Sequence, residues 1–317
     1  MQARIFMKIS ILPVIVFYLL GSGFVYAETE LNDLNEKVET LYFQGNYVGA
    51  IRVAKMALKI AERDFGQDHF NVAASLNNLA ELYRAQGQYA MAKPLLRRAL
   101  LINENALGPD HIDVAMNLNN LALLLHAQEQ YTEAGSLHKR ALEIKEKILG
   151  SDHSDVAISL NNLAALYSTE KGYKEAEKLY KRAMFINEKV YGLGHLSVAT
   201  SLNGLAVLYE EQGKYEKAEP LYRRALIIVE KELGPEHPTV AASLNNLASL
   251  YSIQMLYSQA RPLLKRALKI WVKTLGPEHP DVATGLENLA QLQRKTHQDE
   301  EAVLTEKNAA KIRAVIR

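Results

Sequence analysis

Hydrophobic residues from about position 29 to the end of the chain follow the spacing of amphipathic helices. In residues 71–86, apolar side chains recur at i, i+3, i+4 and i+7, counted from Leu76. Gln86-Gly87-Gln88 then breaks the pattern, and a second helical stretch runs from 89 to 106. The pattern predicts two helices joined by a short turn.

This helix pair recurs every 42 residues along the chain. Its clearest marker is a histidine, found at His69, His111, His153, His195, His237 and His279. Each histidine is followed by Val-Ala and then by a close copy of Leu-Asn-Asn-Leu-Ala, and Gly45-Asn46-Tyr47 adds one unit upstream. A fixed period of this length is typical of repeat solenoids. We therefore predict an all-α superhelical solenoid of about seven helix pairs.

The expected ends of the helices are marked by glycine and by short polar residues. The second helix of each pair stops at Gly66, Gly108, Gly150, Gly192, Gly234 or Gly276, where a left-handed (αL) cap is expected. The next helix opens near Asn71, Asp113, Asp155, Ser197, Thr239 or Asp281, all good N-cap residues. Pro238 and Pro280 would instead suit a helix that starts two residues earlier. That boundary stays open.

The repeated unit resembles the tetratricopeptide repeat. In one unit its motif positions hold Leu76, Leu79, Ala80, Tyr83, Gly87, Tyr89, Ala92, Leu96 and Ala99. The 42-residue length, with Leu-Gly-x-x-His between units and Asn-Asn in the first helix, is similar to the kinesin-light-chain type. The resemblance covers residues 29–317, and it departs at the ends, where Lys37 and Asp299 replace motif residues. Terminal repeats face water on one side, so we interpret these departures as caps.

The resemblance implies a concave groove lined by the first helix of each pair, and it places two columns of asparagine there. The first Asn column is Asn77, Asn119, Asn161, Asn203 and Asn245, and the second Asn column is Asn78, Asn120, Asn162, Asn246 and Asn288. An amide both donates and accepts hydrogen bonds, which suits an extended peptide backbone. We hypothesise an amide ladder that holds a bound main chain. The alternative is that these side chains bond between neighbouring helices, and the two are not exclusive.

Other groove positions narrow the class of ligand. Leu123 is apolar and central, whereas Arg84 lies towards one end. A clamp for a terminal carboxylate needs clustered Lys or Arg, which the middle of the groove lacks, so we expect an internal, partly apolar segment. Gly204 interrupts the second Asn column, through drift or to leave room for a bulky ligand side chain.

Composition removes several classes of function. The 317 residues contain 37 Lys and Arg against 36 Asp and Glu, and no Cys. Balanced charge argues against nucleic-acid binding, and the lack of Cys excludes thiolate chemistry. We find no catalytic motif and expect no cofactor. The repeated histidines should lie on the order of 10 Å apart, too far to share one metal ion, so we expect no metal site and assign them an interhelix role, packing or capping the loop.

Residues 1–27 differ from the rest of the chain. Arg4 and Lys8 precede an apolar run that ends in small residues at Ala27, which is typical of an export signal cleaved before Glu28. Residues 28–317 would then form the solenoid, in the periplasm or secreted. The alternative is a membrane anchor formed by residues 9–27.

Together these patterns predict an exported, non-catalytic scaffold that binds a protein or peptide in its groove. The alternative is a structural solenoid that associates with itself. A third possibility is an enzyme whose site the motifs do not show.

Overall fold

The computed structural model describes residues 25–316, which form helices joined by short turns with no strand in that part of the chain. The helices are α1 (Val25–Phe43), α2 (Tyr47–Phe65), α3 (Phe70–Ala85), α4 (Tyr89–Leu107), α5 (Ile112–Ala127), α6 (Tyr131–Leu149), α7 (Ser154–Thr169), α8 (Tyr173–Tyr191), α9 (Leu196–Glu211), α10 (Tyr215–Leu233), α11 (Pro238–Ile253), α12 (Tyr257–Leu275), α13 (Pro280–Lys295) and α14 (Asp299–Ile316). The predicted all-α solenoid of seven helix pairs is confirmed.

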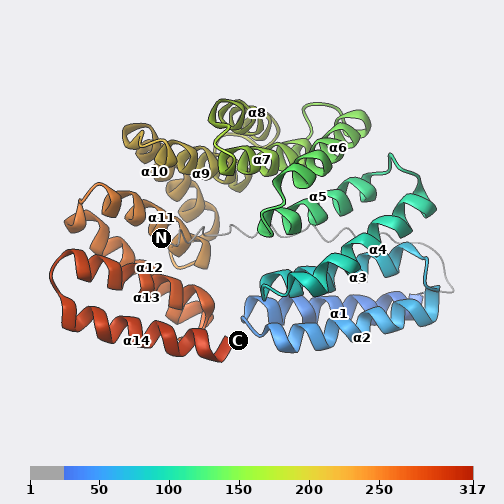
Figure 1. Cartoon of the computed structure of the whole chain (residues 1–317), viewed down its shortest axis with the longest axis horizontal. Coiled ribbons are helices and arrows are strands. Elements are labelled where there is room, and N and C mark those ends of the chain that lie inside the picture. Colours follow the sequence, from blue (N-terminus) through green and yellow to red (C-terminus); the bar gives the residue numbers. More distant parts are fainter. Residues whose placement is uncertain (1–24, 317) are drawn as a thin grey trace.

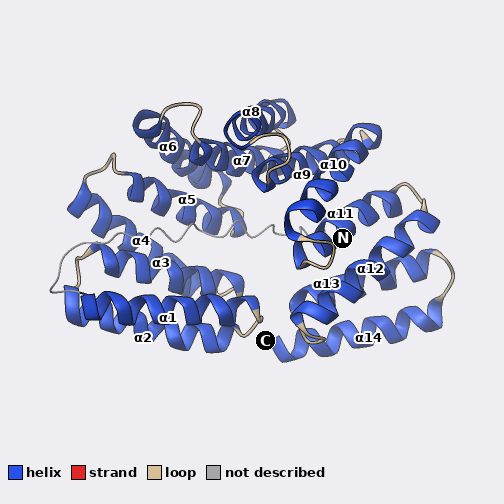
Figure 2. Cartoon of the chain, turned by 180° about the vertical axis from the view of Figure 1, so that it is seen from behind, coloured by secondary structure: helices blue, strands red, loops and turns tan. Residues whose placement is uncertain are grey.

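The seven pairs follow an arc whose two ends approach each other (Figures 1 and 2). We call the odd-numbered helices A helices and the even-numbered ones B helices. The A helices line the inner, concave side of the arc, and the B helices form its outer side (Figure 1). Residues 1–24, most of the predicted leader, lie outside the described residues, and residues 25–27 form the first turn of α1.

Each A helix is apolar over most of its circumference because it packs both on its own B helix and on its neighbours in the array. In α5, for example, Leu118, Leu124 and Leu125 are fully buried. The B helices bury a narrower stripe, marked in α4 by Ala92 and Ala99. Stacking therefore extends one core along the array, as expected for units that cannot bury their apolar faces alone.

The repeated histidines are the N-caps of the A helices. In all six, the ring Nδ1 accepts a hydrogen bond from the backbone N–H two residues later, at 3.1 to 3.3 Å. The sequence predicted an interhelix role, packing or capping the loop, whereas the structure makes each histidine the cap of the helix that follows it. The N-caps predicted at Asn71 and its equivalents were wrong by two residues, since each helix begins at the residue after the histidine. The earlier start also explains Pro238 and Pro280, which occupy the first helical position, where no N–H is needed.

The glycines that end the B helices adopt a conformation other than the predicted αL cap. Their φ angles are +84° to +89° and their ψ angles 156° to 167°. This region is open essentially to glycine alone, whereas αL tolerates other residues. The turn within each pair does use αL geometry, and there Glu129 and Lys171 adopt it with φ of 62°.

Five arginines link successive B helices along one edge of the solenoid. Arg98, Arg140, Arg182, Arg224 and Arg266 each pair with a glutamate 36 residues earlier, at 2.6 to 2.7 Å. Each also donates to a loop carbonyl 31 residues earlier, at 3.1 to 3.3 Å. The joint between α12 and α14 lacks this clamp because Val272 replaces the glutamate and Asn308 replaces the arginine.

Installing the missing clamp should stabilise the last pair slightly. We expect the double substitution V272E/N308R to raise the free energy of unfolding by about 0.5 kcal/mol, since the other clamps are half exposed and such pairs contribute little. Each single substitution should give no gain. A double-mutant cycle in urea measures the coupling, and zero coupling would show that α14 is not placed as its predecessors are.

Candidate functional site

The two Asn columns occupy different environments on the concave side. The first Asn column is buried between adjacent A helices, with exposed fractions of 4 to 7%. The second Asn column is half buried and borders the concave surface, as does Leu123 in α5. Of the predicted groove residues, those in the second column are therefore the more accessible to a ligand.

Side-chain amides bond directly from one A helix to the next. Asn119 and Asn161 donate from Nδ2 to the hydroxyls of Ser159 and Ser201, both at 3.1 Å. The second column donates back to the first, as in the bond from Asn288 Nδ2 to Asn245 Oδ1 at 2.8 Å. Asn120 makes the equivalent bond to Asn77, at 3.4 Å, and Asn78 makes it to Asn35, at 3.2 Å. The first column thus serves the interhelix role that was the alternative hypothesis.

Gly204 interrupts this ladder because a neighbouring side chain fills its space. A Cβ placed on Gly204 would lie 2.3 Å from Cε1 of Tyr180, which comes from α8 and is itself buried. The interpretation of Gly204 as room for a ligand side chain was therefore wrong. Without an Asn at this position, the buried Oδ1 of Asn161 has no hydrogen-bond partner.

A small pocket opens between α9 and α11, with α10 as its floor. It has a volume of about 140 Å³ and is lined mainly by apolar groups, including Leu196, Val229 and Ala242. Asn203 and Asn246 also line it, and the buried Oδ1 of Asn203 has no partner. Val229 lines the pocket at a position where the next unit has the larger Trp271. An apolar group next to an N–H donor would fit this space.

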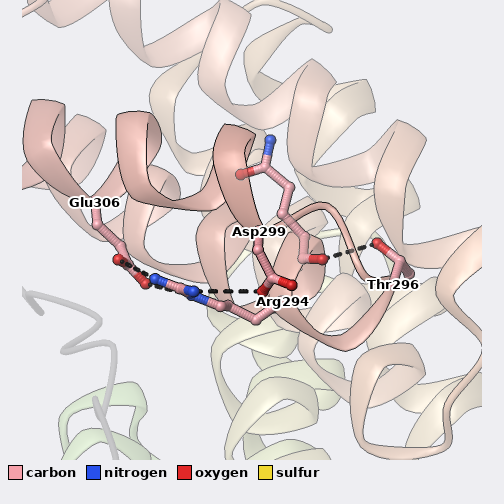
Figure 3. Close-up of polar contacts among 5 residues, drawn as sticks. Arg294, Thr296, Asp299 and Glu306 are labelled. Atoms are coloured by element: carbon pink, nitrogen blue, oxygen red, sulfur yellow. Dashed lines mark hydrogen bonds and ion pairs between the residues drawn. The ribbon is translucent and has the colours of Figure 1, made fainter.

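Two arginines near the ends of the groove, the predicted Arg84 and also Arg294, are paired with acids. The Arg84 side chain is only 14% exposed and pairs with Glu81 on the preceding turn. Burial alone would lower the pKa of Arg84, but the hydrogen bond and charge of Glu81 raise it above its ordinary value. Figure 3 shows Arg294 between Asp299 and Glu306, to which it donates at 3.3 and 2.9 Å.

The sequence patterns missed one fully buried polar contact beneath the groove. His138 of α6 has no exposed surface, and its Nδ1 lies 2.8 Å from Oδ1 of Asn119. Burial, with smaller effects from His126 and Lys145, lowers the pKa of His138 to about 3. The sequence did contain a signal for this contact, because His138 occupies a repeat position at which other units have an apolar residue, Leu96 or Leu264.

Within residues 25–316, no group of three His, Asp or Glu side chains is placed to hold a metal ion. In the same part of the chain, no helix has both the length and the apolar character to cross a membrane.

Comparisons with known proteins agree with this geometry. The tetratricopeptide repeat model matches residues 31–105, 72–134, 113–189, 171–231, 197–257 and 239–314. A search of curated proteins found no match. Among solved structures, kinesin light chain nearly identical TPR-like repeats from Podosopora anserina are 29% identical, with a TM-score of 0.52, covering 65% of this chain and 98% of theirs.

Two more distant structures share the fold. BtubC (BKLC) from P. vanneervenii is 22% identical with a TM-score of 0.55, covering 79% of this chain and 92% of its own. A Rap protein complexed with Competence and Sporulation Factor is 20% identical with a TM-score of 0.66, covering 90% of this chain and 75% of its own. The helix pairs, their 42-residue period and the matches along nearly the whole array lead to one conclusion: the chain belongs to the tetratricopeptide repeat family, and kinesin-light-chain-like repeats are among its structural neighbours.

Proposed function

We propose that this protein is a non-catalytic scaffold that holds an extended segment of another protein on its concave side. The observation that carries the proposal is the second Asn column, a row of half-buried amides that borders the concave surface over five of the seven pairs. Asn120 and Asn288 each donate an N–H to the first column, and Asn78 donates one to Asn35, so the carbonyl oxygens of these three amides remain available to a ligand N–H. The first column supports this row, and of its members only Asn203, which lines the pocket between α9 and α11, is proposed to touch the ligand.

The pocket between α9 and α11 is the proposed anchoring point for the segment. Its volume and apolar lining suit one small aliphatic side chain, and the unpartnered Oδ1 of Asn203 would accept a backbone N–H beside it. Buried polar atoms gain most from being paired, so this contact would favour one register of the segment. The pairing of Arg84 and Arg294 with acids argues further against capture of a terminal carboxylate.

We also propose that the protein is exported, with residues 1–27 as its leader. The support is the sequence alone: two basic residues, an apolar run and a small-residue exit before Glu28. The N-terminal sequence of the protein isolated from its host would test this, since a start at Glu28 is expected and a start at Met1 would favour the anchor.

A photo-crosslinking experiment tests the concave side directly. A benzoylphenylalanine at Leu123, on the concave side, should capture the partner segment in the native host. The same group at Leu101, which is 57% exposed on the outer side, is the control and should capture nothing specific. Equal capture from both positions, or dimers of this chain from Leu101, would favour the self-associating solenoid instead.

Substitutions separate ligand contact from structural support. Changing Asn120, Asn162 and Asn246 to Ala should reduce the Leu123 crosslink about tenfold or more while the melting temperature changes by only a few degrees. The matched set Asn119, Asn161 and Asn245 should lower stability more, since those side chains are buried. If the second-column variant crosslinks as the parent does, the amide row does not bind the segment.

A further inference from the structure

The first and last helix pairs touch each other, although more than 200 residues of chain separate them. We call the six residues involved the clasp: Phe43, Gly45 and Tyr47 around the α1–α2 turn, and His279, Pro280 and Asp281 at the start of α13. A Cβ on Gly45 would lie 3.0 Å from His279 Cδ2 and 3.2 Å from Pro280 Cδ. The equivalent turn glycines Gly87 and Gly213 have nothing within 4 Å. The contact therefore belongs to the first pair alone.

The burial of His279 also indicates that the first and last pairs touch each other. His279 is 9% exposed, whereas the five equivalent N-cap histidines are half buried or exposed. Its Nδ1 accepts from the N–H of Asp281 at 3.1 Å, and its ring lies beside Gly45. Burial lowers the pKa of His279, and Asp281 and the Phe43 backbone act in the opposite direction. One imidazole therefore caps α13 and reaches the opposite end of the solenoid.

Charges on both sides of the clasp influence one another. Burial raises the pKa of Tyr47 to about 12, with added effects from Tyr42 in α1, Glu81 in α3 and Asp281 in α13. Burial also raises the pKa of Asp281, against the lowering effects of His279 and Arg313. The N-terminal and C-terminal pairs thus share one electrostatic environment.

We propose that the clasp opens and closes reversibly and so controls access to the concave side. The contact is small, and apart from it each pair packs only on its sequence neighbours, so slight rotations at the six joints add up at the ends. A closed clasp surrounds the concave side, and an open one admits a segment from the side without threading a chain end. That consequence for the ligand rests on the proposed function, whereas the clasp itself does not.

Spin labels measure the clasp without any ligand. The chain has no cysteine, so Q44C and E278C, at exposed residues beside the contact, give two unique labels in the full-length protein. Pulsed electron–electron distance measurements should give a short and a long distance that coexist. The matched pair Q86C and Q128C, at equivalent turns of adjacent pairs, should give a single distance. One short distance alone, or one long distance alone, would overturn the reversible clasp.

Two histidine variants separate the clasp from helix capping. H279A should decrease the population of the short distance by about half or more, because it removes the ring that lies beside Gly45. H237A removes the same kind of cap from α11, whose histidine is exposed, and should leave both populations unchanged. If both variants act alike, the effect comes from capping and the proposal fails. Since no partner is present, this result is independent of whether the concave side binds peptides.

Discussion

Replacing Gly204 with alanine should lower the free energy of unfolding by about 2 kcal/mol, although alanine is normally the better helix residue by about 1 kcal/mol. The new Cβ would lie 2.3 Å from Tyr180 Cε1 and 2.7 Å from its Cζ. Tyr180 is buried and packed in the core between α8 and α9, so it has no free space into which to move. Urea denaturation followed by circular dichroism measures the change.

A control glycine and a compensating pair make this test specific. Gly135, in the interior of α6, would place its Cβ 3.3 Å from the end of the flexible Leu166 side chain, so G135A should be neutral or stabilising. The double substitution Y180L/G204N recreates the Leu96 and Asn120 combination found elsewhere in the array and should recover most of the loss. Equal effects of G204A and G135A would show that Tyr180 does not set the size of residue 204.

Acidification should destabilise the solenoid through His138, and H138L should remove that part of the pH dependence. The folded-state pKa is about 3, whereas an unfolded histidine titrates near 6.5. The folded state therefore favours the neutral ring: its contribution is complete above pH 6.5 and is lost as the pH falls towards 3. Between pH 7 and 5 the loss should be about 2 kcal/mol, from 1.36 kcal/mol for each unit below 6.5.

The pKa of His138 is low because its buried ring has no second acceptor beside it. The neutral ring can donate from Nδ1 to Asn119 Oδ1, whereas the buried Nε2 has no partner, so an added proton there would be buried and unpaired. Unfolding free energies at pH 7 and 5, measured for the parent and H138L, give the contribution by difference. Parallel pH profiles for the two proteins would mean that His138 does not restrict protonation in the folded state.

The sequence determined the local structure of this protein because the fold is built from near neighbours. The 42-residue period, the apolar spacing and the punctuating glycines predicted the seven helix pairs. The histidine spacing also indicated a structural role in place of metal binding, since a residue that recurs before every A helix serves each unit in the same way. Local propensity did misplace the N-caps by two residues, because Asp and Ser are the usual caps and the histidine side chain was not expected to compete.

Tertiary structure decided which repeated residues face a ligand and which face a neighbour. Asn77 and Asn78 are adjacent and chemically identical, and a helical projection placed both in the groove, yet stacking buries one column and leaves the other at the surface. The size of Tyr180 likewise explains why residue 204 is a glycine, because the two residues are in contact between units. The clasp between Gly45 and His279 depends on the sum of six small rotations, and no local pattern encodes that sum. The sequence therefore specified each unit, while the accumulated packing angles decided how the two ends meet.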